Sequence, residues 1–362
     1  MLTLLCISDT GTAQPVQVFN TENGLPHNRV NRIYSDSKNF LWICTDDGLS
    51  RFDGHQFVNY TTANGLPHKY VNAVLETRTG EYWVATDGGV SRFDPKPGQT
   101  RFRNYAPADA EEARHVNALI EDADGSLLLG TSAGLYRFRA LRHPASFERI
   151  DFGPSPDPPN PVRVHAIAQD SRGSVWLATN YGLYQRGKNV GWTHYGRESG
   201  GFDRWIGAEP APFVSSFADE RNGRLWVAFN SGFGRIAIDP KPGAPVLDFV
   251  QTDQLGLGRV RALWFGADGR RWIATETGLK EWVIDSNDAS WFREHTIQDQ
   301  FPQEAFLSIR EDTAGNLWIG TRRSGLVRMG SSRFQTFGAT EGLRLGGDQS
   351  SAADPVRPSL CF

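Results

Sequence analysis

The sequence predicts an all-β fold: a seven-bladed β-propeller of four-stranded antiparallel blades, closed by the N-terminal strand joining the last blade. One pattern recurs seven times, with an apolar residue placed twelve positions before a Trp or Leu: Val30 and Trp42, Val71 and Trp83, Val116 and Leu128, Val164 and Trp176, Val214 and Trp226, Val260 and Trp272, Phe306 and Trp318. Successive Trp or Leu positions lie 41 to 50 residues apart, which is the period of propeller blades. Gly, Asp and Pro interrupt every unit and favour short strands over helix pairs.

The first unit shows the expected order of four strands and their turns. We predict strands over Val30–Tyr34, Leu41–Thr45, Leu49–Phe52 and Phe57–Tyr60. The turn between the first two strands recurs as Asp-x-x-Gly at Asp122–Gly125, Asp170–Gly173 and Asp312–Gly315. An Asp in the first position caps such a turn through its side chain, and a Gly in the last position adopts positive φ without a Cβ penalty. A hairpin loop of fixed length keeps the spacing at twelve residues.

The second strand of each unit, typified by Leu-Trp-Ile-x-Thr, has almost no polar residue and is therefore expected to be buried on both faces. Burying one Trp ring stabilises the fold by roughly 2 to 3 kcal/mol, so we interpret these Trp residues as structural. Leu128 replaces the Trp once, which predicts that blade three is the weakest packed. Cys44 stands where other units carry Ala or Gly and is expected to be a small buried filler.

The two ends of the repeat region predict how the ring closes. Val16–Phe19 and Phe334–Phe337 both resemble fourth strands, and we expect the first to complete the outer edge of blade seven. The propeller is assigned to residues 14–337. Residues 1–13 are interpreted as the remnant of a secretory signal peptide, with a disordered cytosolic leader as the alternative. Residues 338–362 are expected to hold the start of a further repeat and a disordered or truncated tail.

Composition and motifs argue against several classes of function. The net charge is −3, with mixed signs and no basic stripe, which argues against nucleic acid as a partner. No metal-ligand, cofactor or phosphate-binding motif occurs, so no metal and no cofactor are predicted. The Gly-x-Ser-x-Gly pattern at Gly130–Gly134 belongs to the repeat and places Ser132 in a strand-to-strand turn, whereas a nucleophile elbow needs a strand-to-helix turn. No catalytic residue is predicted.

The first strand of each blade lines the central channel, and the residue after its leading Val or Phe is repeated around the channel mouth. This ring consists of Asn31, Asn72, Asn117, His165, Ser215, Arg261 and Leu307. The next position carries Ala or Ser in six blades and Arg32 in the first. Two interpretations of the ring stay open: it satisfies backbone groups of the loops, or it offers donors and acceptors to a ligand.

Other candidates for ligand binding lie on the same face. The residues just before the leading Val are often large or basic: Arg29, Tyr70, His115, Arg163 and Arg259. The turns between second and third strands add Asp87, Tyr181, Glu276 and Arg322, and the insertion Gly196 to Pro212 adds Trp205, the Trp expected to be exposed. Aromatic rings with amide and charged neighbours suit an oligosaccharide or another polar small molecule. His27 and His68 both follow Gly-Leu-Pro and are expected to cap a shared loop instead of binding a metal.

The repeated phrase Asn-Gly-Leu-Pro, Val-x-x-Ile and Asp-x-x-Gly-x-Leu-Trp-Ile-x-Thr-x-x-Gly-Leu-x-Arg-Phe-Asp resembles the two-component regulator propeller repeat. Residues 22–53 and 63–94 match nearly in full, and the unit at Val214 departs by Phe229 and Phe233. The resemblance covers about residues 16–343. It implies a periplasmic, ligand-binding sensor domain of a bacterial signal-transduction receptor, here expected to be truncated.

In complete receptors of this family a β-sandwich, a transmembrane helix and a cytoplasmic histidine kinase or diguanylate cyclase follow the propeller, and the resemblance is compatible with a homodimer. Two alternatives stay open. One is a platform for protein interactions. The other is a propeller lyase or glycoside hydrolase that would place His115, His165, Asp87 or Glu276 over the channel.

Overall fold

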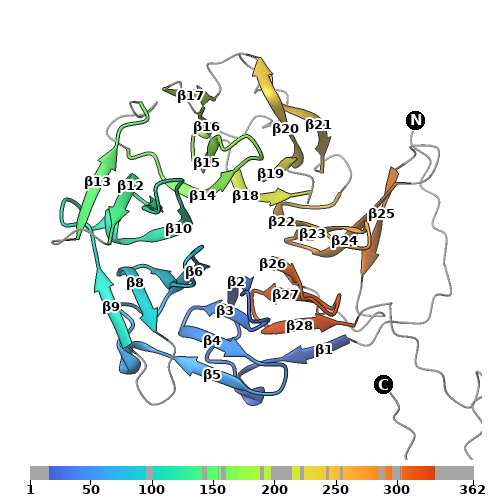
Figure 1. Cartoon of the computed structure of the whole chain (residues 1–362). Coiled ribbons are helices and arrows are strands. Elements are labelled where there is room, and N and C mark those ends of the chain that lie inside the picture. The colour runs from blue at the N-terminus through green and yellow to red at the C-terminus, as the bar shows by residue number, and fades with distance from the viewer. Residues whose placement is uncertain are drawn as a thin grey trace, which may run out of the picture.

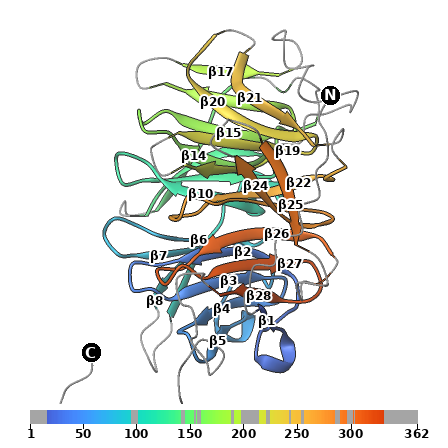
Figure 2. The ribbon, with the colours of Figure 1, turned by 90° about the vertical axis from the view of Figure 1, so that its right-hand side faces the viewer.

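Seven four-stranded antiparallel sheets surround a central axis in the computed structural model of the chain, which confirms the predicted seven-bladed propeller (Figure 1). The structure describes residues 16–94, 101–140, 145–153, 155, 160–187, 191–196, 214–220, 224–241, 244–252, 256–284, 290–295, 302 and 304–330. Turned by 90°, the ring is seen from its edge (Figure 2). In the described part of the chain the helices are three-residue 3-10 turns, η1 (Thr21–Asn23), η2 (Thr62–Asn64) and η3 (Glu112–Arg114), and no helix there is long and apolar enough to cross a membrane.

Each blade is named here by its strands, from the inner to the outer strand. Blade one is β2 (Val30–Ser35), β3 (Leu41–Thr45), β4 (Gly48–Phe52) and β5 (Phe57–Tyr60), and blade two is β6 (Val71–Glu76), β7 (Tyr82–Thr86), β8 (Gly89–Asp94) and β9 (Arg101–Tyr105). Blade three is β10 (Val116–Glu121), β11 (Leu127–Thr131), β12 (Gly134–Arg139) and β13 (Ser146–Ile150), and blade four is β14 (Val164–Gln169), β15 (Val175–Thr179), β16 (Gly182–Arg186) and β17 (Trp192–Tyr195). Blade five is β18 (Val214–Asp219), β19 (Leu225–Phe229), β20 (Gly232–Lys241) and β21 (Ala244–Gln251), and blade six is β22 (Val260–Phe265), β23 (Arg271–Thr275), β24 (Gly278–Ile284) and β25 (Ser290–His295).

Blade seven combines both ends of the propeller, as predicted. Its strands are β26 (Phe306–Glu311), β27 (Leu317–Thr321), β28 (Leu326–Met329) and, at the outer edge, β1 (Val16–Phe19). Val16 pairs with Met329 and Phe19 pairs with Leu326, so the N-terminal strand closes the ring. The predicted signal-peptide remnant and the segment Phe334–Leu343 lie outside the described residues.

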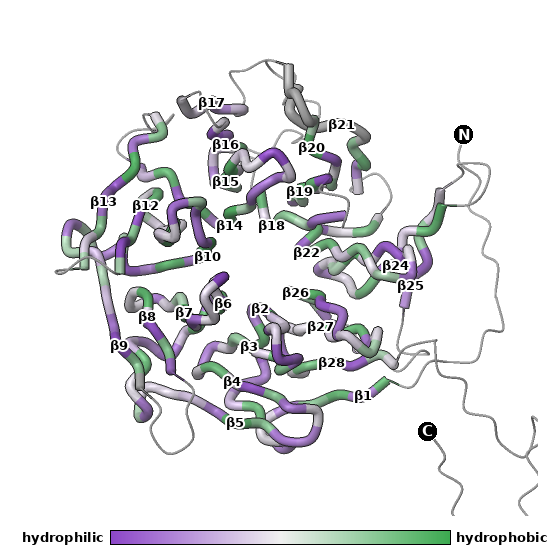
Figure 3. Tube along the Cα trace, viewed as in Figure 1, coloured by the Kyte–Doolittle hydropathy of each residue, from purple (hydrophilic) through white to green (hydrophobic). Residues whose placement is uncertain are grey.

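The hydrophobic core is divided among the blade interfaces. Seven clusters of buried side chains are found among the described residues, and each cluster spans two adjacent blades. For example, Ala166 and Trp176 of blade four pack with Val214 and Val227 of blade five. Green hydrophobic segments are accordingly distributed around the whole ring (Figure 3). The six repeat Trp residues are at most 5% exposed and Cys44 is fully buried, which confirms their predicted structural role.

The acidic residue that opens the turn between the first and second strands has a second function that the sequence did not reveal. Asp36 Oδ1 accepts hydrogen bonds from the backbone N–H groups of Lys38 and Phe40, both at 2.9 Å, which confirms the predicted cap. Its Oδ2 accepts the indole N–H of Trp42 at 2.8 Å. The equivalent bonds join Trp176 to Asp170, Trp226 to Glu220 and Trp318 to Asp312. One carboxylate thus fixes both the turn and the repeat Trp.

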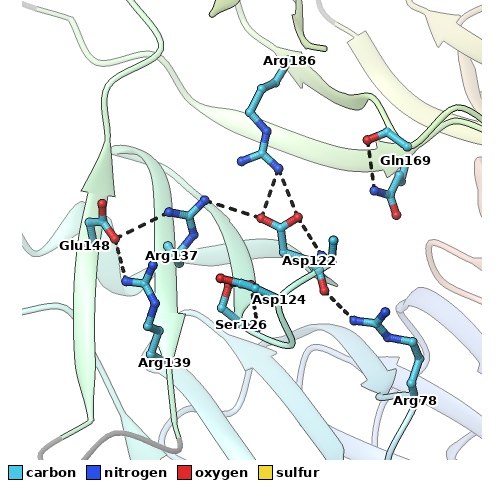
Figure 4. A network of polar contacts seen from close by, with 11 residues as sticks. Arg78, Asp122, Asp124, Ser126, Arg137, Arg139, Glu148, Gln169 and Arg186 are labelled. Carbon is cyan, nitrogen blue, oxygen red and sulfur yellow. Dashed lines mark hydrogen bonds and ion pairs between the residues drawn. The ribbon is translucent and has the colours of Figure 1, made fainter. Parts of the chain in front are cut away.

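Blade three lacks the Trp, and its turn carboxylate is held by arginines (Figure 4). Both oxygens of Asp122 accept hydrogen bonds from Arg186 of blade four at 3.1 Å, and Arg137 lies 3.5 Å away. Leu128 is fully buried in the cluster between blades three and four. An ion pair across the interface therefore takes the place of the indole bond, and the weaker packing of blade three stays a prediction.

Candidate ligand-binding face

One face of the ring is formed by the loops that enter the inner strands and by the turns between second and third strands. In five blades a backbone N–H of the turn donates to the carbonyl just before the inner strand: Asp87 to Tyr70 (3.2 Å), Ser132 to His115 (3.1 Å), Asn180 to Arg163 (3.3 Å), Glu276 to Arg259 (3.0 Å) and Arg322 to Ala305 (3.0 Å). The two predicted groups of candidates are therefore neighbours on one face, which we call the mouth face.

Every inner strand begins with a β-bulge at the ring position. In blade one Val30 pairs with Thr45 and Arg32 pairs with Cys44, so Asn31 has no partner in β3. The same register shift occurs in the other six blades. A bulge takes one side chain out of the regular alternation of a strand and points it in a new direction. The Ala two residues after the leading Val then packs toward the next blade, as Ala166 does against Val214.

The bulged side chains join neighbouring blades. In four blades the side chain donates to the carbonyl of the leading Val of the next blade: Asn31 to Val71 (3.3 Å), Asn72 to Val116 (3.0 Å), Asn117 to Val164 (3.1 Å) and Ser215 to Val260 (3.1 Å). Asn31 and Asn72 also donate to Asp46 and Asp87, at 2.9 and 2.7 Å. This contact, here called the mouth clasp, supports the structural interpretation of these four positions.

The other three ring positions differ from the mouth clasp. Arg261 pairs with Glu276 of its own blade, and Leu307 is apolar. His165 is half-buried, and burial, followed by the nearby Arg163 guanidinium, lowers its pKa to about 4. Its imidazole is therefore neutral at pH 7.

The residues just before the inner strands, together with Arg322 of the β27–β28 turn, include more exposed side chains than the ring, whose members are all half-buried. Tyr70 is 37% exposed, and Lys69 Nζ lies 5.0 Å from its ring centre. Arg163, Arg259 and Arg322 are exposed, and His115 is half-buried. Arg29 Nε donates to Asn31 Oδ1 at 3.1 Å and lies 3.7 Å from Asp46, with 41% of its side chain exposed. A cationic and aromatic rim thus surrounds the ring.

Three remaining predictions have different outcomes. Tyr181 lies in the β15–β16 turn, where its carbonyl is 2.9 Å from His194 Nε2. His27 and His68 accept the N–H groups of Arg29 and Tyr70 through Nδ1, at 2.9 and 3.2 Å, which confirms that they cap their loops. Trp205 lies outside the described residues.

The two candidate carboxylates, Asp87 and Glu276, are engaged in contacts within their own blades. Asp87 accepts from Asn72, and Glu276 pairs with Arg261. Ser132 lies in the β11–β12 turn, as expected, and its hydroxyl is 3.5 Å from Asn117 Nδ2. The predicted cationic donors of the mouth face that are most exposed to solvent are therefore the rim arginines Arg163, Arg259 and Arg322.

Sequence reasoning missed a cavity on the opposite face, where the inner strands end. Its volume is about 340 Å³, and it is lined by residues of blades one, six and seven: Ser35, Asp36, Trp264, Ala267, Arg310, Glu311, Asp312 and Thr313. These residues are far apart in the sequence. A comparison of the last inner-strand residue between repeats would have been the signal to find it.

Comparison with known proteins identifies the repeats. The family model described as two component regulator propeller matches residues 24–47, 157–181 and 300–323. No curated protein sequence matches the chain. Extracellular domains of two B. thetaiotaomicron proteins described as hybrid two component systems resemble it, at 19% and 17% identity and TM-scores of 0.67 and 0.65, over 87% and 89% of this chain.

The chain spans only 42% and 40% of the length of those two domains. Virginiamycin B lyase from Staphylococcus aureus resembles it at 14% identity and a TM-score of 0.62, over 87% of this chain and 99% of the lyase. At these identities the structural likeness shows the fold alone. The three family-model matches cover the start of blades one, four and seven. Blades one, four and seven therefore carry two component regulator propeller repeats, and the resemblance inferred from the sequence is confirmed.

Proposed function

We propose that this propeller is the periplasmic sensor domain of a bacterial signal-transduction receptor and binds a polar small molecule, such as an oligosaccharide, at its mouth face. The observation that carries the proposal is the match of three repeats to the two component regulator propeller model. The likeness to extracellular domains of hybrid two component systems supports it. In a complete receptor the output would come from a kinase or cyclase beyond a membrane helix.

The contacts on the mouth face give the ring residues and the rim residues different roles in the proposed site. Asn31, Asn72, Asn117 and Ser215 are engaged in the mouth clasp, so they would hold the shape of the site. Ligand contact would fall mainly to the rim, where Arg29, Tyr70, Arg163, Arg259 and Arg322 are exposed or half-buried. Arginine forks and aromatic faces are suited to the hydroxyl and carboxylate groups and to the apolar faces of sugars.

A binding screen followed by rim substitutions tests this proposal. A library of oligosaccharides and other polar metabolites is screened by calorimetry, and the affinity of the best ligand is then measured for Tyr70→Ala, Arg163→Ala and Arg259→Ala. We expect at least a tenfold loss of affinity for two of the three variants, since each removes a direct contact.

Lys38→Ala is the matched control, because Lys38 is an exposed cation in the Asp36 turn at the opposite end of β2. Its affinity should equal that of the unmodified protein. Unchanged affinity in all three rim variants would place the ligand elsewhere and contradict the proposed site.

A further inference from the structure

Three blade interfaces are joined on the face opposite the mouth by a glutamate at the end of an inner strand. In each case its carboxylate accepts hydrogen bonds from the second residue of the preceding blade's turn: Glu76 from Ser37 N–H (2.8 Å) and Ser37 O–H (2.7 Å), Glu121 from Arg78 N–H (2.7 Å), and Glu311 from Ala267 N–H (2.9 Å). We call this contact the carboxylate clasp. It shows that the repeat builds a carboxylate-binding position at the turn.

The interface between blades seven and one has the donors of this clasp and a different residue in place of the acid. Ser35 ends the inner strand β2 at the position that Glu76, Glu121 and Glu311 occupy in their blades. Thr313 is the second residue of the preceding turn, and it carries the same two donors, N–H and O–H, as Ser37. No described residue accepts a hydrogen bond from Thr313. This turn thus presents the donors of a carboxylate clasp next to a short serine.

The cavity of about 340 Å³ lies at this interface, with Ser35 and Thr313 both in its lining. A serine side chain has three heavy atoms fewer than a glutamate side chain and cannot reach the turn donors. The space that a glutamate fills at other interfaces therefore becomes part of the cavity. The third blade in the lining contributes Trp264 and Ala267.

Arg310 adds a cation of fixed orientation to the same cavity. Its guanidinium carbon lies 4.8 Å from the ring centre of Trp264 in blade six and 5.9 Å from that of Tyr34 in blade one. Stacking on aromatic rings holds the planar guanidinium in place, and the plane presents its N–H groups at the edge. A carboxylate is the group whose geometry matches such an edge.

We infer that the cavity between blades six, seven and one is a second ligand site, and that it binds a carboxylate carried by a small molecule. The ligand carboxylate would accept from Thr313 N–H and O–H, as Glu76 does from Ser37, and would lie within reach of Arg310. This inference does not depend on the proposed sensor function, because the site lies on the other face and uses none of the rim residues.

The lining holds three acidic residues, Asp36, Glu311 and Asp312, and each already accepts hydrogen bonds from the protein; Asp312 accepts the backbone N–H of Asn316 and the indole N–H of Trp318. Their negative charge opposes an anion, so binding of a carboxylate would depend on the Thr313 donors and on Arg310. Asp36 accepts hydrogen bonds from two backbone N–H groups, from the indole N–H of Trp42 and from the hydroxyl of Tyr82. Glu311 accepts Trp264 and Ala267, at 3.3 and 2.9 Å. The interface between blades one and two supplies the precedent, since the Glu76 carboxylate binds Ser37, the residue directly after Asp36.

The test follows the indole N–H signal of Trp264 by NMR, assigned through Trp264→Phe, while ligands are added at constant ionic strength. The probes are acetate, glucuronate and triglycine, which present the same carboxylate as a simple acid, a sugar acid and a peptide end, with glucose and chloride as neutral and ionic controls. We expect a saturable shift with at least one carboxylate probe and none with glucose or chloride. The probe that saturates at the lowest concentration identifies the source.

Two pairs of variants distinguish carboxylate binding in this cavity from carboxylate binding elsewhere on the protein. Ser35→Glu restores the acid of the repeat and should weaken carboxylate binding at least tenfold, whereas Ser35→Ala should bind within twofold of the unmodified protein. Thr313→Pro removes the N–H at a turn position that favours Pro and should weaken binding at least fivefold, whereas Thr313→Ala keeps the N–H. Glu121–Asp122 and Glu311–Asp312 show that an acidic pair is tolerated where Ser35→Glu would create one.

Two results would overturn the inference. One is the absence of a saturable shift with all three carboxylates, or a shift that glucose reproduces. The other is binding by Ser35→Glu and Thr313→Pro that equals that of their partners Ser35→Ala and Thr313→Ala.

Discussion

At the scale of single residues, His165 shows how one substitution in a repeat changes its chemistry. The equivalent positions in blades one to three carry Asn and form the mouth clasp. An imidazole in the same half-buried place has to stay neutral, because burial and the Arg163 guanidinium lower its pKa to about 4. The ring therefore contains one group whose protonation opposes folding.

This pKa predicts a loss of stability in acid. In the unfolded chain the pKa of His165 is about 6.5, so between pH 6.5 and pH 4 only the unfolded state binds the proton. The stabilisation is complete above pH 6.5 and is lost as pH falls toward 4. Urea denaturation at pH 7 and at pH 4.5 gives the drop in the free energy of unfolding of each protein. We expect this drop to be about 2 to 3 kcal/mol smaller in His165→Asn than in the unmodified protein.

The exposed His55 supplies the control, since His55→Asn should keep the pH dependence of the unmodified protein. Equal pH dependence in the unmodified protein and in His165→Asn would contradict the buried, neutral state of His165.

At the scale of elements, the bulge at the start of each inner strand explains why the mouth clasp can form. It turns Asn72 toward both Asp87 and the carbonyl of Val116, which is fully buried. Asn72→Ala leaves that carbonyl without its donor, and we expect the free energy of unfolding to fall by about 1 to 3 kcal/mol. Asn72→Ser should recover about 1 kcal/mol of this loss, since Ser215 reaches Val260 in the same way. Urea denaturation of the two variants checks the order, and equal stability of Asn72→Ala and the unmodified protein would exclude a role for the clasp.

The elements also show what could and could not be predicted from the sequence. The second strands and their buried Trp residues were predictable, because seven copies share one hydrophobic pattern. The bulge was not predictable, because the alternation of buried and exposed residues along a strand does not show that one residue, such as Asn31, is left out of the pairing with the next strand. The cavity was missed for another reason: Ser35, Trp264 and Arg310 come from three blades, and only closure of the ring brings them together. The closing strand was predictable, because the sequence contains one more candidate fourth strand than there are blades, and Val16–Phe19 precedes the first unit.

At the scale of the whole molecule, the closure between blades seven and one combines the pairing of β1 with β28 and a hydrophobic cluster that includes Phe19, Phe52 and Trp318. β1 completes blade seven, and the ring of Phe19 lies 5.9 Å from Trp318 of blade seven and 5.7 and 5.8 Å from Phe52 and Phe57 of blade one. Phe19 therefore contacts both sides of the closure.

Deleting residues 1–20 removes the strand and this contact together, leaves β28 as an open edge and should lower the midpoint of thermal unfolding by more than about 10 °C. Phe19→Ala keeps the strand and should lower it by about 5 °C, because a half-buried ring is lost. Val18→Ala changes an exposed residue of the same strand, 41% exposed, and should leave the midpoint within about 1 °C. Since the proposed carboxylate site lies at this interface, the deletion should also abolish the carboxylate-dependent shift of Trp264, whereas Val18→Ala should retain it. An unchanged midpoint after the deletion, measured by calorimetry, would mean that the ring does not depend on its N-terminal strand.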